Sequence, residues 1–127
     1  MVYLIDDDES VRRALQRLLR SAGLDVRAFA SAEEFLKMEN FSQGACIVLD
    51  VQMRGLSGFD LQKTLASKNI RIPTIAVSAL DDADTRERAR LLGAVGFFRK
   101  PVDGQALIDA IHWAIGGAKH KPGPSDS

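Results

Sequence analysis

The stretch CIVLDVQM, residues 46 to 53, decides the fold. Four apolar or nearly apolar residues run into a single aspartate, Asp50, and the apolar pattern stops there. A short apolar run without alternation is typical of a strand that is buried on both faces, as in a parallel sheet. Since burying an unpaired charge is costly, the carboxylate at the end of this strand indicates a functional site there.

The composition fits one domain without a strong electrostatic field. The chain has 127 residues, of which 46% are hydrophobic, enough for one sizeable core. Seventeen basic side chains balance seventeen acidic ones, so no net field attracts nucleic acid or an anionic membrane. The only cysteine, Cys46, lies in an apolar run, which excludes a disulfide framework. With no membrane-length apolar run and no signal peptide, we expect a soluble, cytoplasmic protein.

Strand and helix patterns alternate along the chain. Apolar strand patterns and helical periodicities follow one another five times. Asp8 is expected to cap the first helix and Gly23 to end it, and the spacing of Ser31 and Glu34 predicts a capping box at the second helix. The predicted strands cover 2–5, 24–29, 46–49, 74–77 and 95–98, and the predicted helices cover 9–22, a segment after Ser31, 59–67, 83–92 and 103–115.

This alternation predicts a doubly wound α/β fold. Parallel strands need crossover connections, and right-handed crossovers place helices on both faces of the sheet. We expect a flavodoxin-like domain over residues 1–116, with five parallel strands in the common order 2-1-3-4-5 and five helices. Residues 117–127 are expected to form a flexible tail. Ligands of such sheets bind beyond the carboxyl ends of the strands.

Polar residues follow four of the predicted strands. Asp6 and Asp7 come after the first strand, Asp50 after the third, Ser78 after the fourth and Lys100 after the fifth. If strands one and three are neighbours, three carboxylates converge, and two charges about 4 Å apart repel by about 4 kcal/mol near a protein surface. A divalent ion with oxygen ligands would offset this repulsion, and Mg²⁺ suits few protein ligands plus waters. Lys100 can supply a second positive charge.

These residues can carry phosphoryl transfer. Cations neutralise phosphoryl oxygens while a carboxylate attacks phosphorus in line and forms an acyl phosphate. We take Asp50 as the nucleophile because it stands alone, whereas Asp6 and Asp7 form a pair suited to holding a metal. Each feature alone also fits an ordinary structural role, such as a turn, a helix cap or a solvated lysine. Their joint placement at one edge of the sheet favours the site.

Two other classes share this type of sheet. Phosphohydrolases with an aspartyl nucleophile have a second acid two residues later, where this chain has Gln52. Flavodoxin-like cofactor carriers have a phosphate loop rich in Gly, Ser and Thr after the first strand, and none follows here. Turnover of a phosphomonoester would favour the first class, and a coloured protein the second.

Four motifs, LIDDDES, IVLDVQMRGLSG, AVSA and FRKP, in this order and spacing, resemble the receiver domain of two-component response regulators. The resemblance covers residues 1–116 and is to the subgroup similar to nitrogen-fixation regulators. It implies that Asp50 is the phosphoacceptor, that Asp7 binds Mg²⁺ directly and Asp6 mostly through water. The backbone carbonyl of Gln52 would complete the metal site.

The resemblance also implies roles at the other strand ends. Ser78 would hydrogen-bond the phosphoryl group, Lys100 would pair with it, and Phe97 would be the aromatic switch residue. The peptide bond between Lys100 and Pro101 would be cis. One departure is that Arg54 occupies a position where the family usually has proline, which puts the rigidity of that loop and the phosphate lifetime in question.

The expected function is a phosphorylation-dependent switch. A sensor histidine kinase, a phosphotransfer protein or acetyl phosphate would phosphorylate Asp50 with Mg²⁺, and the chain would catalyse only its own phosphorylation and dephosphorylation. Helix 83–92, strand 95–98 and the last helix would signal to a downstream protein or form a homodimer. We expect a stand-alone receiver without direct nucleic-acid or membrane binding. The alternative is a receiver excised from a longer DNA-binding transcriptional regulator.

Two features of this expected signalling face concern its packing. Helix 83–92 is mostly polar and has few residues to bury, so we expect it to be weakly anchored. On the last helix, Trp113 lies off the apolar stripe. This position fits two interpretations equally well: Trp113 lies on a partner surface, or its side chain packs along a neighbouring helix.

Overall fold

The computed structural model describes residues 1–116, and the predicted tail at 117–127 lies outside the described residues. Five parallel strands form one sheet in the order β2-β1-β3-β4-β5, as predicted. The elements alternate along the chain as β1 Val2–Ile5, α1 Glu9–Ser21, β2 Val26–Phe29, α2 Ala32–Leu36, β3 Cys46–Asp50, α3 Gly58–Ser67, β4 Thr74–Ser78, α4 Ala83–Leu91, β5 Ala94–Arg99 and α5 Gly104–Gly116.

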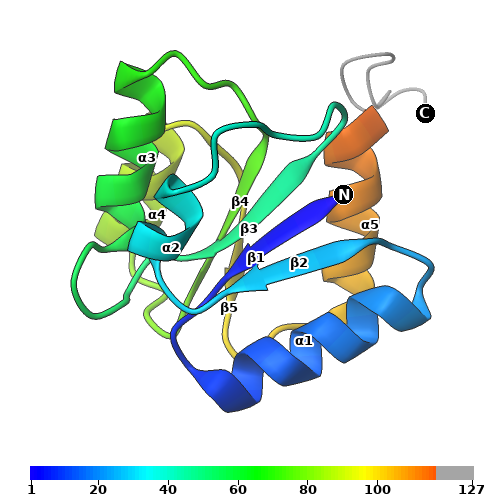
Figure 1. The fold of residues 1–127 in the computed structure, drawn as a ribbon. Helices are drawn as coiled ribbons and strands as arrows, with labels where there is room; N and C mark the ends of the chain where they lie inside the picture. The colour runs from blue at the N-terminus through cyan, green and yellow to red at the C-terminus, as the bar shows by residue number, and fades with distance from the viewer. Residues whose placement is uncertain (117–127) are drawn as a thin grey trace.

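Helices cover both faces of the sheet (Figure 1). Leu19 of α1 and Ile111 of α5 pack with Leu4 on one face. Phe35 of α2 and Leu61 of α3 pack on the other face, in a second apolar cluster. Because both faces are covered, strands β1, β3 and β4 are buried along their whole length, and Cys46 is a buried core residue. Within residues 1–116, no helix is long and apolar enough to cross a bilayer.

Most element ends follow from local signals, with one correction. Asp8 caps α1 by accepting from the N–H of Val11, as predicted. At α2, Ser31 accepts from the N–H of Glu34, but the Glu34 carboxylate accepts from Ala30 instead of from Ser31. The predicted capping box is therefore only half formed, because the Glu34 carboxylate bonds the N–H of Ala30, one residue before the cap residue Ser31. A complete box, not predicted, opens α3 with Ser57 and Asp60.

Gly58, the first residue of α3, lets the chain return closely over the end of β3. A Cβ atom at this position would lie 2.5 Å from the backbone oxygen of Asp50. Only glycine permits this approach without displacing the backbone that carries Asp50. The β3–α3 loop is thereby held next to the end of β3.

Helix α4, one of the elements predicted to signal, buries few apolar side chains. Ala89 is the only buried residue of α4, while Leu91 is 69% exposed. Trp113 of α5 is 43% exposed, so its side chain lies at the surface. The prediction of weak apolar anchoring for α4 is confirmed.

Candidate functional site

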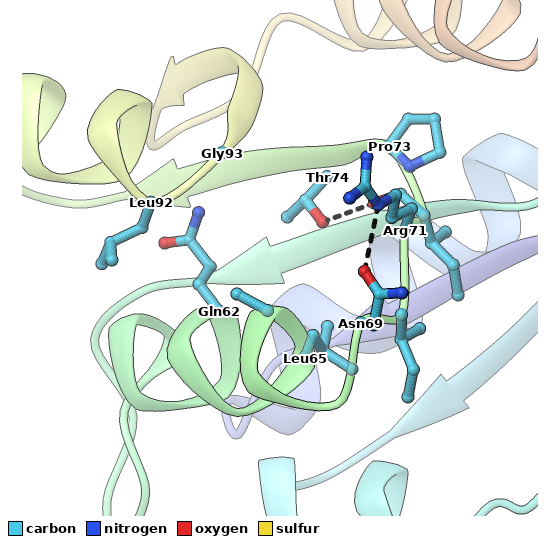
Figure 2. Close-up of a pocket in the computed structure, with 11 residues that line it drawn as sticks. Gln62, Leu65, Asn69, Arg71, Pro73, Thr74, Leu92 and Gly93 are labelled. Carbon is cyan, nitrogen blue, oxygen red and sulfur yellow. Dashed lines mark hydrogen bonds between the residues drawn. The ribbon is translucent and has the colours of Figure 1, made fainter.

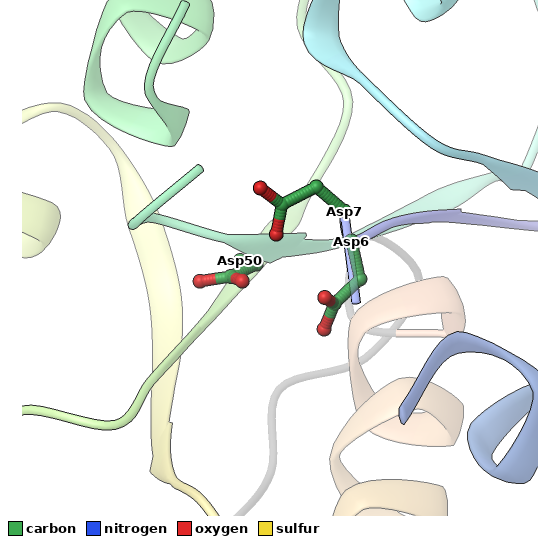
Figure 3. Close-up of side chains that lie close together, drawn as sticks. All are labelled: Asp6, Asp7 and Asp50. Atoms are coloured by element: carbon green, nitrogen blue, oxygen red, sulfur yellow. The ribbon is translucent and has the colours of Figure 1, made fainter. Parts of the chain in front are cut away.

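Three carboxylates meet at the carboxyl end of the sheet, where β1 and β3 are neighbours (Figure 3). Ile5 pairs with Leu49, so Asp6, which follows β1, lies beside Asp50, the last residue of β3. One carboxylate oxygen from each of Asp6, Asp7 and Asp50 lies within 4.8 Å of the others. Asp6 is 2% exposed and Asp50 5% exposed, so the site concentrates negative charge in a poorly solvated position.

Lys100 joins two of these carboxylates. Its Nζ lies 3.0 Å from Oδ2 of Asp6 and 3.1 Å from Oδ2 of Asp50. The backbone N–H of Lys100 donates to the carbonyl of Ser78 at 2.8 Å, and the following bond to Pro101 is cis, as expected. One ammonium cannot neutralise three carboxylates, and all three offer the hard oxygen ligands that Mg²⁺ prefers. These residues therefore fit a divalent cation.

Burial and neighbouring charges shift the pKa values of Asp50 and Lys100. Burial raises the pKa of Asp50 to about 6, and the charge of Asp6 adds to this, while the N–H of Gln52 and the Lys100 ammonium oppose it. For Lys100, burial alone lowers the pKa, but hydrogen bonds and charge from Asp6 and Asp50 raise it overall. At neutral pH the pair is a carboxylate beside an ammonium.

Ser78 lies at the end of β4, fully buried and already hydrogen-bonded. Its Oγ donates to Oε1 of Gln52 at 3.0 Å and accepts from the N–H of Leu80 at 3.0 Å. A new acceptor can therefore receive the Ser78 hydroxyl only by displacing the Gln52 side chain.

The protein-family model for the response regulator receiver domain matches residues 2–112. The chain belongs to this family. The transcriptional regulatory protein TdiR of Thauera aromatica is 41% identical over 114 residues, which are 90% of this chain and 50% of TdiR. The transcriptional regulatory protein FixJ of Azorhizobium caulinodans is 38% identical over 115 residues, covering 91% of this chain and 54% of FixJ. The resemblance to nitrogen-fixation regulators is thereby confirmed.

A solved structure agrees with the fold of this receiver. The crystal structure of FixJ-N has a TM-score of 0.80 at 33% identity and covers 90% of this chain and 91% of that one. The receiver spans about half the length of TdiR and FixJ.

Gln52 does more in this receiver than the sequence indicated. Only its backbone carbonyl was predicted to act, as a metal ligand, and that role stays a prediction. The backbone N–H of Gln52 donates to Oδ1 of Asp50 at 2.9 Å, and its side chain accepts from Ser78. No sequence pattern predicts this side-chain contact between the end of β4 and the β3–α3 loop. Glu33 was also missed, although its carboxylate accepts from the N–H of Leu56 in the β3–α3 loop at 3.3 Å.

Arg54 contributes its backbone to the receiver's acidic cluster. Its N–H donates to Oδ2 of Asp7 at 3.0 Å. Proline, the usual residue of the family here, has no N–H and could not make this bond. The departure from the family pattern thus fixes a carboxylate in the site.

Phe97 lies on β5, half-buried next to Val51 and Ala76. The guanidinium carbon of Arg86 lies 4.8 Å from the centre of its ring, and Arg86 also pairs with Asp81 in the β4–α4 loop. The side chain proposed as the switch is thus covered by a residue of α4.

Proposed function

We propose that this receiver is a phosphoacceptor switch in which Asp50 takes a phosphoryl group from a sensor histidine kinase or a phosphotransfer protein. The observation that carries this proposal is the Lys100 ammonium held between Asp50 and Asp6, beside Asp7. The Lys100 ammonium offsets the repulsion between the Asp50 carboxylate and an anionic phosphoryl donor, so the nucleophile can approach phosphorus.

In the proposed reaction, a carboxylate oxygen of Asp50 attacks phosphorus, the bond from phosphorus to the donor breaks with its electron pair leaving on the donor, and an acyl phosphate forms. Lys100 neutralises the transferred group. Mg²⁺, held by Asp7, Asp50 and the Gln52 carbonyl, with Asp6 acting through water, would supply further positive charge to the phosphoryl oxygens. Water later hydrolyses the acyl phosphate, so the chain turns over no separate substrate.

The phosphoryl group changes the balance of contacts around Ser78. It offers charged acceptor oxygens in place of the neutral Gln52 amide, and hydrogen bonds to charged groups contribute about 1.5–3 kcal/mol each. Converting a 1:99 equilibrium to 99:1 needs about 5.5 kcal/mol, so new contacts to Ser78 and Lys100 are about sufficient. The responding face comprises α4, β5 and α5, with Phe97 as its link to Ser78.

This α4–β5–α5 face is suited to an apolar partner. Leu91 is 69% exposed, Val95 47% and Trp113 43%, one from each of the three elements. Exposed large apolar side chains on adjacent elements favour a protein contact, which we propose to be a homodimer or a downstream protein. We place this signalling in the cytoplasm, without membrane binding.

We propose two contexts in which this receiver can act as a switch. A stand-alone receiver signals by protein contact only. A receiver within a longer DNA-binding regulator passes the signal to a second domain, and relatives named transcriptional regulatory proteins, of which this chain spans about half, support this alternative at least as well. In both, we propose that the residues of this domain do not themselves bind nucleic acid.

The proposed function is tested by intact-mass spectrometry of the wild type after incubation with acetyl phosphate, with Mg²⁺ and with EDTA. We expect the mass of one phosphoryl group to be added only with Mg²⁺. If the protein stays unmodified, a panel of histidine kinases and phosphotransfer proteins follows. Failure of that panel as well would favour a phosphorylation-independent interaction module.

Arg54→Pro is expected to weaken Mg²⁺ binding about threefold, because Asp7 loses the N–H that fixes its orientation. A side chain released in this way regains about 0.5–1.5 kcal/mol of rotamer entropy, which binding must then remove. Isothermal titration with Mg²⁺ measures the affinity. Arg54→Ala keeps the N–H but removes the guanidinium, so it should bind Mg²⁺ like the wild type. Equal weakening in both variants would assign the effect to the side chain.

A further inference from the structure

Gln62 is a buried amide between α3 and α4, away from the carboxylate cluster. It is 4% exposed, and its Nε2 donates to the backbone carbonyl of Ala89 at 3.1 Å. Figure 2 shows the Gln62 side chain rising from α3 toward α4, near Leu92. It is therefore a direct polar link between a helix of the scaffold and a helix of the proposed signalling face.

The carbonyl that Gln62 reaches lies in the last turn of α4, where the helix itself leaves carbonyls without donors. The N–H of Leu92 goes to Arg88 and the N–H of Gly93 goes to Arg90. Gln62 thus supplies a donor to Ala89 from another helix, and it caps α4 from the side.

The link is only half satisfied. Among the residues that the structure describes, Oε1 of Gln62 is the one buried side-chain polar atom without a hydrogen-bond partner. Rotating the amide by half a turn would not help, because a carbonyl oxygen needs the NH₂ group as its donor. An unpaired buried acceptor costs free energy, so the bond from Nε2 to Ala89 is what offsets the burial of this amide in the resting arrangement.

The surroundings of Gln62 leave room for α4 to move. Ala89 is the only residue that α4 buries, and a pocket of about 470 Å³ adjoins the link (Figure 2). Apart from Ala89, a main contact toward α3 is the guanidinium carbon of Arg88, 4.4 Å from the ring centre of Phe59. The pocket is lined by Gln62, Leu65 and Ala66 of α3, by residues 69–74 and by Leu92 and Gly93.

We propose that Gln62 is a positioning residue that holds α4 in its unphosphorylated arrangement, and that its hydrogen bond to Ala89 must break when α4 responds to phosphorylation. This rests on the proposed function, since it assumes that α4 belongs to the responding face. The bond then opposes activation, because only the resting arrangement contains it. By linkage, removing the bond must favour both the rearranged state and the phosphoryl group that selects it.

The test is the affinity of the Mg²⁺-loaded protein for BeF₃⁻, a phosphoryl mimic, measured by isothermal titration. Gln62→Met keeps the length of the unbranched side chain but has no N–H to donate to Ala89. We expect BeF₃⁻ to bind Gln62→Met about three- to tenfold more tightly than the wild type, because one hydrogen bond no longer holds the resting state. Gln16→Met makes the same chemical change on α1, across the sheet, and should bind like the wild type.

A merely structural role for Gln62 gives a different result. In that case Gln62→Met lowers the thermal stability but leaves BeF₃⁻ affinity unchanged or weaker, and this outcome overturns the proposal. If the variant does not fold, hydrogen exchange of the wild type decides. Amides of residues 89–93 should exchange faster when BeF₃⁻ is bound, and unchanged exchange also overturns it. Failure of the wild type to bind BeF₃⁻ or accept phosphate would instead reject the proposed function.

Discussion

Asp50→Asn is expected to abolish the phosphoryl adduct from acetyl phosphate while leaving the fold intact. The neutral amide lacks the nucleophilic carboxylate oxygen that must attack phosphorus. The other groups of the site, Lys100 and Ser78, stay in place because they are positioned by β5 and β4. Intact-mass spectrometry in the presence of Mg²⁺ measures the adduct, and circular dichroism checks the fold.

The control for this loss is Asp8→Asn, the same chemical change two residues beyond Asp6. Asp8 caps α1 through its side-chain oxygen, and asparagine caps helices about as well as aspartate. This variant should therefore keep both the helix and the adduct. An adduct that persists in Asp50→Asn would move the phosphoacceptor to another group, with Asp6 and Asp7 the first candidates by proximity.

Much of this site follows from the sequence because topology alone positions it. Strands that run parallel end at one edge of the sheet, so residues placed after four apolar runs had to meet there. The register of β1 against β3 then places Asp6 beside Asp50. The helix signals worked where one local contact decides, as at Asp8, and less well where two must coincide, as at Ser31 and Glu34.

Side-chain contacts between elements that lie far apart in the sequence could not be predicted in the same way. The bond from Ser78 to Gln52 depends on the path of the β3–α3 loop, which Gly58 brings close to Asp50. Gln62 lies within an amphipathic helix where a glutamine is ordinarily solvated, and only the docking of α4 buries it. Such contacts depend on tertiary geometry, which neither periodicity nor motif spacing encodes.

Asp50→Asn is also expected to raise the free energy of unfolding by about 3 kcal/mol at pH 7 in EDTA, because the folded carboxyl has its pKa raised from 3.8 to about 6. Between these values the folded state binds a proton that the unfolded state has lost, so this group's contribution to stability is complete below pH 3.8 and falls until about pH 6. Above that, folding must hold a buried anion that the amide avoids. Urea unfolding at pH 7 and at pH 4 measures both proteins. We expect a wide gap at pH 7 that nearly closes at pH 4. A gap of equal size at both pH values would mean that packing around residue 50, and not its charge, sets the difference.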